Sequence, residues 1–181
     1  MPRTVIQQFD VYRFDELTPQ AKDRAREWHQ RAGDAYVWAH EALDSLKAFA
    51  QHFGARLTNW QIDWANSSPS RAEFTTPYDD PTPEELAEQL DALGTYNPET
   101  LRGLGECKLT GYCTDENAID GFRIAFMRDG ERDLSKLLQA GFRTWLAACH
   151  ADYADFYSDE TFAEQCHNND YEFKVNGEFY S

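Results

Sequence analysis

A helix followed directly by a strand is the sequence feature that most constrains how this chain folds. The helix is bounded by Asp34, whose carboxylate can accept from first-turn N–H groups, and by Gly54, which can adopt positive φ without a Cβ clash. Apolar residues recur between them at helical spacing: Ala39, Ala42, Leu43, Leu46, Phe49, Ala50 and Phe53. After Gly54 the apolar period changes to two, which predicts a strand with Trp60, Ile62 and Trp64 on its inner face. We expect this helix and strand to form the centre of the core.

The preceding segment predicts a second helix that pairs with the first. Thr18 suits an N-cap, Pro19 suits the first helical position because its missing N–H costs nothing there, and Gly33 ends the pattern. One face of this helix carries small apolar residues and a tryptophan: Ala21, Ala25, Trp28 and Ala32. Because alanines allow close approach, we expect a two-helix hairpin across a tight turn at Gly33 and Asp34.

The rest of the pattern predicts an α+β fold. Strands are expected at 5–14, 71–76 and 107–114, and helices at 83–93, 116–126, 134–157 and 159–167. The expected N-caps of these helices are Thr82 in a capping box with Glu85, then Asp115, Asp133 and Ser158. Gly121 weakens the helix in which it lies. Asn176-Gly177 between two β-rich runs predicts a C-terminal hairpin with a type I′ turn.

Together these elements indicate a helical hairpin and a long helix packed on a small, mostly antiparallel sheet. The expected organisation is a single domain over 1–181, with 77–83 as its best internal linker. A hydrophobic content of 41% supplies enough apolar mass for a core.

The net charge of −15 limits the partners that this chain can bind directly. Residues 151–181 alone carry eight acidic and one basic side chain. Nucleic acids and anionic membranes take most of their affinity from cationic contacts, so both are poor partners. An acidic surface fits a basic protein, and the alternative is that the charge serves solubility alone.

The sequence favours a cytoplasmic location. No apolar run approaches the roughly 18 residues of a membrane-spanning helix, and the first ten residues lack the apolar region of a signal peptide. The cysteines are therefore expected as reduced thiols.

Two acidic clusters are the candidate partner-binding sites. They comprise Asp152, Asp155, Asp159, Glu160 and Glu164 near the C-terminus, and Asp79, Asp80, Glu84 and Glu88 around the start of the helix at 83–93. Acids at i,i+3 or i,i+4 project from one helix face roughly 5–6 Å apart, so they can substitute for phosphates in a basic groove. The alternatives are a solvated helix face and a divalent metal site, although no D-x-D-x-D-G loop is present.

A cysteine and histidine set is the candidate zinc site: Cys107, Cys113, Cys149, His150, Cys166 and His167. The spacing does not match a known zinc module, and buried structural thiols are the favoured interpretation. The sequence contains no G-x-S-x-G, P-loop, G-x-G-x-x-G or H-E-x-x-H motif, so we expect neither an enzyme nor a cofactor.

Three segments resemble a family of phage and prophage proteins. Residues 14–28, FDELTPQAKDRAREW, resemble the FDEL(S/T)xxAKxxAR(D/E)W helix that opens those proteins, and Cys107–Cys113 and Asn169–Gly177 resemble later segments. Members are sometimes labelled antitoxin-like, and no catalytic residues carry over. The resemblance implies an accessory protein of a mobile element, of the kind that blocks host defence by binding.

The favoured functional prediction is a non-enzymatic phage-derived inhibitor of a host defence system. Like an anti-CRISPR protein, it would bind a basic, nucleic-acid-handling host protein in the bacterial cytosol through an acidic, DNA-mimicking surface. The first alternative is an antitoxin that neutralises a cognate toxin. The second is a metal-dependent enzyme or zinc-stabilised domain that uses the cysteine and histidine set.

Overall fold

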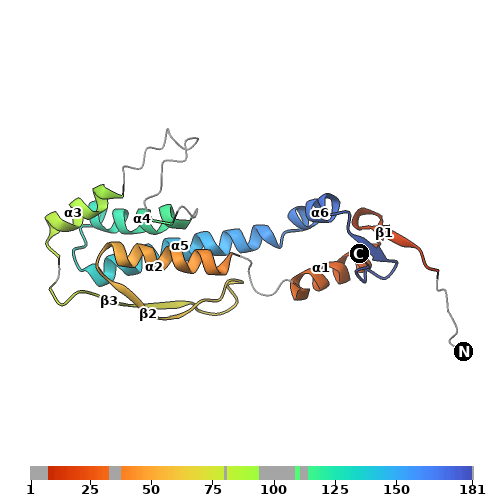
Figure 1. Ribbon diagram of the computed structural model, residues 1–181, viewed down its shortest axis with the longest axis horizontal. Helices are drawn as coiled ribbons and strands as arrows, with labels where there is room; N and C mark the ends of the chain where they lie inside the picture. Colours follow the sequence, from red (N-terminus) through yellow and green to blue (C-terminus); the bar gives the residue numbers. More distant parts are fainter. Residues whose placement is uncertain (1–7, 33–37, 80, 94–108, 111–113, 181) are drawn as a thin grey trace, which may run out of the picture. The chain divides into compact units, whose positions relative to one another are not determined.

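The computed structural model describes residues 8–32, 38–79, 81–93, 109–110 and 114–180. The chain divides into two compact units. Unit 1 comprises Met1–Val37 and Ala154–Ser181, and unit 2 comprises Trp38–Tyr153. The expected linker at 77–83 lies within unit 2, and the single folding domain stays a prediction. The secondary structure confirms the α+β class, with helices in both units and one two-stranded antiparallel sheet in each (Figure 1).

Unit 1 brings the two ends of the described chain into one sheet. Its elements are β1 (Val11–Arg13), the 3-10 turn η1 (Phe14–Glu16), α1 (Pro19–Ala32), α6 (Asp159–Asn168) and β4 (Glu172–Lys174). β1 pairs antiparallel with β4, with Tyr12 opposite Phe173. Of the strand expected at 5–14, residues 11–13 form β1 and residues 8–10 are described outside any strand. Phe14 turns into η1 and enters the core, and residues 5–7 lie outside the described residues.

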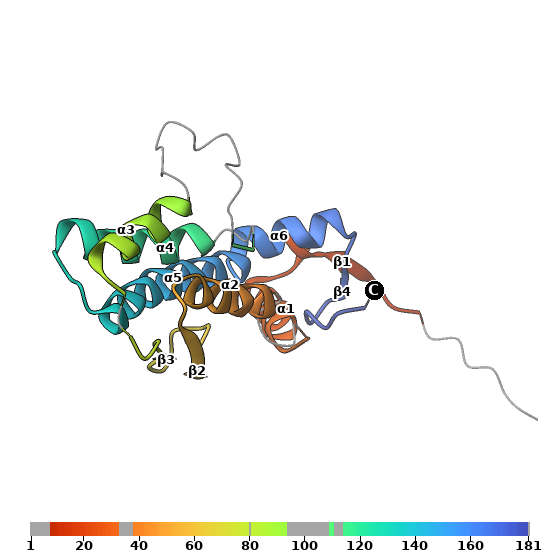
Figure 2. The same ribbon diagram turned by 60° about the vertical axis from the view of Figure 1, so that its left-hand side comes forward.

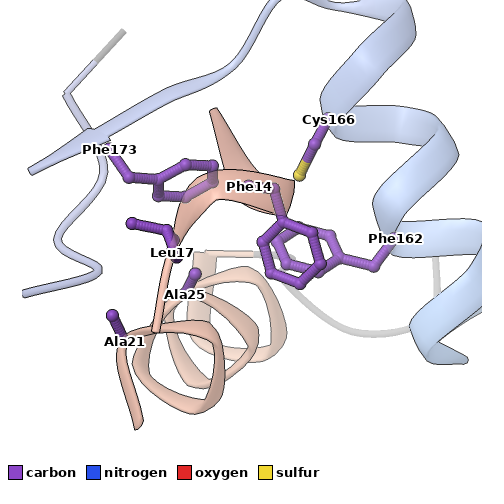
Figure 3. Close-up of a cluster of buried hydrophobic side chains, with 7 residues drawn as sticks. All are labelled: Phe14, Leu17, Ala21, Ala25, Phe162, Cys166 and Phe173. Carbon is purple, nitrogen blue, oxygen red and sulfur yellow. The ribbon is translucent and has the colours of Figure 1, made fainter. Parts of the chain in front are cut away.

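The core of unit 1 is built from aromatic rings around the small residues of α1. Figure 3 shows its buried members: Phe14, Leu17, Ala21, Ala25, Phe162, Cys166 and Phe173. The ring centroids of Phe14 and Phe162 lie 4.9 Å apart in an edge-on arrangement. The alanine face of α1 packs within unit 1 on η1, α6 and β4. The expected hairpin would pair α1 with a helix of unit 2, so it stays a prediction.

The C-terminal turn differs from the predicted type I′ geometry. Lys174 donates its N–H to the carbonyl of Glu178, and Phe173 bridges to Phe179, so a short hairpin forms. Gly177 has a φ of +84°, whereas Asn176 is not among the described residues with positive φ. Both central residues of a type I′ turn need positive φ, so that prediction is wrong, and the loop is the three-residue kind with a left-handed glycine.

Unit 2 is mainly helical. Its elements are α2 (Ala39–His52), β2 (Arg56–Gln61), β3 (Arg71–Thr75), α3 (Pro83–Ala92), α4 (Thr114–Arg123), a π-helical turn η3 (Ile124–Arg128) and α5 (Leu134–Phe156), whose last three residues belong to unit 1. Figures 1 and 2 show α2 and α5 side by side, with α3 and α4 on one side and the β2–β3 hairpin on the other.

Glycines allow the helices of unit 2 to approach closely. A Cβ at Gly141 of α5 would overlap the ring of Phe49 and the carbonyl of Ala118, and a Cβ at Gly121 of α4 would overlap Thr144 and the backbone of α5. We expected Gly121 only to weaken its helix. Its position shows that it is instead a contact point between two helices.

The helix and strand expected at the centre of the fold are only partly confirmed. Gly54 is in the left-handed conformation, with φ of +70°, and closes α2 by a Schellman pair of hydrogen bonds, as its sequence position predicts. At the other end α2 begins after Trp38 rather than after Asp34, which lies outside the described residues.

The predicted inner face of the following strand is wrong. β2 begins at Arg56 directly after the helix cap, and Trp60 on it is 42% exposed, with the Lys47 ammonium 5.8 Å from its ring centroid. Trp64 lies beyond the end of β2 and contacts Trp145 at 6.0 Å between ring centroids. A two-stranded sheet has few neighbours, so one face of β2 meets solvent. The strand predicted at 71–76 is confirmed by β3, which pairs antiparallel with β2.

Local capping predictions are confirmed in both units. The cap oxygens accept first-turn N–H groups at Thr18, Thr82, Asp133 and Ser158. Asp115 is instead the second residue of α4, is fully buried and accepts from the N–H and hydroxyl of Thr110. Of the strand expected at 107–114, Leu109 and Thr110 are described outside any strand and Thr114 begins α4; the rest lies outside the described residues.

Candidate functional site

The C-terminal acidic cluster is divided between the two units. Asp155 at the end of α5 and Asp159, Glu160 and Glu164 on α6 belong to unit 1 and are exposed, whereas Asp152 belongs to unit 2 and is half-buried. Ser158 caps α6, and α6 buries Phe162 and Cys166. The amphipathic pattern therefore turns Glu160 and Glu164, one turn apart, towards solvent.

One member of this cluster is neutralised inside unit 1. The guanidinium of Arg26 on α1 donates to a carboxylate oxygen of Asp159 at 2.9 Å and to Asp23 at 2.8 Å. The Arg26 side chain is only 28% exposed, so this pair links α1 to α6. Asp159 therefore has a structural partner, which removes the main reason for placing it in a binding surface.

The second acidic cluster lies in unit 2. Glu84 and Glu88 are exposed one turn apart on α3, and Asp79 is exposed in the loop before it. Asp80 lies outside the described residues. Because the clusters belong to different units, we treat them as separate surfaces. We name Asp155, Glu160 and Glu164 the α6 acidic face, and Glu84 and Glu88 the α3 acidic face.

The candidate zinc ligands are also divided. Cys149 is buried in unit 2, and Nε2 of the adjacent His150 lies 2.9 Å from the Asp63 carbonyl oxygen. Cys166 and His167 belong to unit 1, and Cys107 and Cys113 lie outside the described residues. The described residues contain no group of three or more histidines, cysteines or carboxylates placed to hold a metal ion.

The Cys166 thiol is held in its protonated form by burial. Burial raises its pKa to about 11, so the nucleophilic thiolate is scarce. Cys166 packs in the aromatic core of unit 1, which agrees with the predicted structural role.

A groove in unit 1 is the feature that sequence reasoning missed. Its volume is about 330 Å³, and its walls come from η1 and the end of β1 on one side and from α6 and the turn after it on the other. The polar and aromatic residues that line it include Arg13, Phe14, Asp15, His167, Asp170 and Tyr171. About 150 residues separate the two walls in sequence, so they are brought together by the pairing of β1 with β4 and by the packing of Phe14 on Phe162.

Asp170 occupies an unusual backbone position at the edge of this groove. It follows the C-cap of α6, where its N–H donates to the carbonyl of His167 and the N–H of Tyr171 donates to that of Cys166. This is a Schellman turn, in which glycine is the usual residue because φ is positive; Asp170 has φ of +51°. An aspartate two residues after the end of a helix does not by itself indicate a groove, so the sequence held no signal for this site.

Comparisons with protein-family models, with curated proteins and with solved structures give no significant match. The resemblance to phage and prophage proteins therefore remains an expectation from the sequence. Within the described ranges, no helix is both long enough and apolar enough to cross a membrane.

Proposed function

We propose that this protein is a non-enzymatic inhibitor of phage or prophage origin that binds a basic, nucleic-acid-handling protein of the bacterial cytosol. The α6 acidic face would make the contact. The observation that carries this proposal is that Asp155, Glu160 and Glu164 are exposed together near one helix terminus and form no ion pair with the described residues. Their neighbour Asp159, by contrast, is held by Arg26.

Physical chemistry favours a role for these charges in binding. Like charges at i,i+4 on a helix cost a few tenths of a kcal/mol, so Glu164 does not help the fold. Glu160 lies in the first turn of α6, where the helix dipole favours a carboxylate. The net charge of −15 would draw a basic partner to the surface, and unneutralised carboxylates would then raise the association rate.

The α6 acidic face is preferred to the α3 acidic face because of its surroundings. Both have two exposed glutamates one turn apart. The groove lies beside the C-terminal end of α6 and presents two further carboxylates, Asp15 and Asp170. A partner on unit 1 would therefore meet charge and a concave surface together.

The experiment is capture of partners from a bacterial lysate by the immobilised full chain, with a DNA duplex as competitor. We expect a basic nucleic-acid-binding protein that is released by the duplex and by salt, because DNA and the acidic face would compete for one basic surface. Retention of a neutral or acidic partner despite the competitor would overturn the proposal. Capture of a toxin that lacks a nucleic-acid site would assign the antitoxin function instead.

A further inference from the structure

We propose that the groove of unit 1 binds the guanidinium group of an arginine side chain on the partner. This inference rests on the proposed function, since it names the chemical group that the acidic surface recognises. The groove lies at the C-terminal end of α6, so a protein that meets the α6 acidic face can reach it. A volume of about 330 Å³ suits an inserted side chain.

The charges that line the groove favour a cation. Asp15 and Asp170 supply two carboxylates, Arg13 supplies one positive charge, and His167 supplies an imidazole. Arg13 Nη2 lies 3.6 Å from the Asp170 carboxylate, beyond hydrogen-bond distance, and the two side chains are 61% and 83% exposed. A pair this exposed and this long is weak, so the Asp170 carboxylate keeps its capacity to accept from a second donor.

The other walls suit a planar cation. Half-buried Tyr171 contributes aromatic carbon, and Cys166 is a buried, protonated thiol. The ring of buried Phe14 already lies under two cations of unit 1, with Lys22 Nζ 5.4 Å and Arg26 Cζ 5.6 Å from its centroid. A guanidinium can stack on an aromatic ring while it donates to a carboxylate, which a compact ammonium group does less well. This combination favours arginine over lysine.

Asp170 is unfavourable for the fold in two ways. Its φ of +51° is a conformation that glycine adopts at lower cost. Its negative charge lies at the C-terminal end of α6, where the helix dipole favours cations. A residue that opposes the fold at both levels, yet lines a groove, is typical of a binding site.

The test is an NMR titration of the full chain with N-acetyl-L-arginine amide, with N-acetyl-L-citrulline amide as the neutral isostere. We expect saturable shifts centred on residues 13–15 and 166–171, with a Kd of roughly millimolar strength for so small a ligand. The citrulline compound should produce none. Shifts that do not saturate, that spread over all acidic residues, or that both compounds cause, would overturn the inference.

Two variants with opposite expected signs sharpen the test. Asp170→Asn should weaken binding about tenfold, because it removes a charged acceptor while asparagine still tolerates positive φ. Arg13→Gln should strengthen binding about twofold to fivefold, because it removes the competing cation. Asp10→Asn is the matched control, since Asp10 is exposed in the same unit but does not line the groove. Equal effects of Asp10→Asn and Asp170→Asn would contradict a local site.

Asp170→Gly separates binding from folding. This variant should raise the thermal unfolding midpoint and abolish binding of arginine amide. A purely structural role for Asp170 would instead lower both the midpoint and the affinity, or would leave the affinity unchanged. The inference fails alone if duplex-sensitive capture of a basic partner persists while arginine amide does not bind. The proposed function fails alone if arginine amide binds in the groove but no basic partner is captured.

Discussion

Two helices of this molecule, α3 in unit 2 and α6 in unit 1, follow nearly the same sequence pattern. Each has ten residues after a hydroxyl N-cap, with glutamates at the second and sixth positions, alanine at the fifth and glutamine at the seventh. Leu86 and Leu90 are buried from α3, and Phe162 and Cys166 are buried at the same positions of α6. The pattern therefore specifies the same amphipathic helix twice.

The helices differ in what surrounds them. α3 begins with Pro83 and a full capping box between Thr82 and Glu85. α6 begins with Asp159, which is paired to Arg26, and ends in the strained turn at Asp170 beside the groove. Two exposed glutamates on a helix are thus insufficient to indicate a binding site. The elements that surround the helix determine whether a binding surface is present.

The largest predicted effect is the loss of the buried ring on α6 compared with the equivalent leucine on α3. Phe162→Ala should lower the free energy of unfolding by about 4 kcal/mol and Leu86→Ala by about 3 kcal/mol, since both side chains are almost fully buried. Hydrogen exchange should show lost protection in unit 1 for the first and in unit 2 for the second. Equal loss across 11–32 and 39–52 in either variant would instead show one cooperative domain.

A glycine pair gives the next largest difference. Gly177→Ala should cost about 3 kcal/mol, because φ is +84° and the new Cβ would overlap the Ala21 backbone on α1. Gly130→Ala in unit 2 should cost about 1 kcal/mol, because φ is +74° but nothing lies within 4 Å. Urea unfolding measures both, and equal costs would contradict the close approach of the C-terminal turn to α1.

The N-caps of the paired helices should have smaller effects. Ser158→Ala and Thr82→Ala should each cost about 1 kcal/mol, because each removes an acceptor for a first-turn N–H. Thr82→Ala should cost slightly more, since Glu85 also binds the backbone N–H of Thr82 and the reciprocal box is broken. Urea midpoints at neutral pH measure these costs, and an unchanged midpoint for either variant would contradict the observed cap.

The smallest effect is a pH dependence in unit 1. His29 is half-buried and stacks on Phe162 at 4.5 Å between ring centroids, and burial lowers its pKa from the ordinary 6.5. The unfolded chain therefore binds a proton first as the pH falls, so stability should decrease as the pH drops through about 6.5 and level off below the folded-state pKa. His29→Phe should reduce this slope in urea titrations between pH 7.5 and 5.5. The same slope in both proteins would exclude His29 as its source.

Local features of the fold could be predicted from the sequence because their causes are local. The caps at Thr18, Thr82, Asp133 and Ser158 and the glycine at Gly54 each depend on a few neighbouring residues. The buried stripes of α2 and α5 follow from helical periodicity for the same reason.

Features that depend on distant contacts could not be predicted. Trp60 fits the inner face of a strand by pattern, but a two-stranded hairpin leaves it exposed. From the sequence, Gly121 is expected only to lower the stability of its helix. Its role in the close contact with α5 appears only when both helices are seen together. The groove needs η1 and the end of α6 together, so none of its residues forms a motif in the sequence.

The most direct test of the central claim compares charge reversal on the two matched helices. Glu160→Lys with Glu164→Lys on α6, and Glu84→Lys with Glu88→Lys on α3, change the net charge equally at equivalent helix positions. Stopped-flow association with the captured basic partner would be followed as the salt concentration rises. We predict that the α6 variant associates about tenfold more slowly at low salt and depends less on salt, while the α3 variant stays within about twofold of the unmodified protein. An equal loss in both variants, or a larger loss in the α3 variant, would contradict the assignment of binding to unit 1.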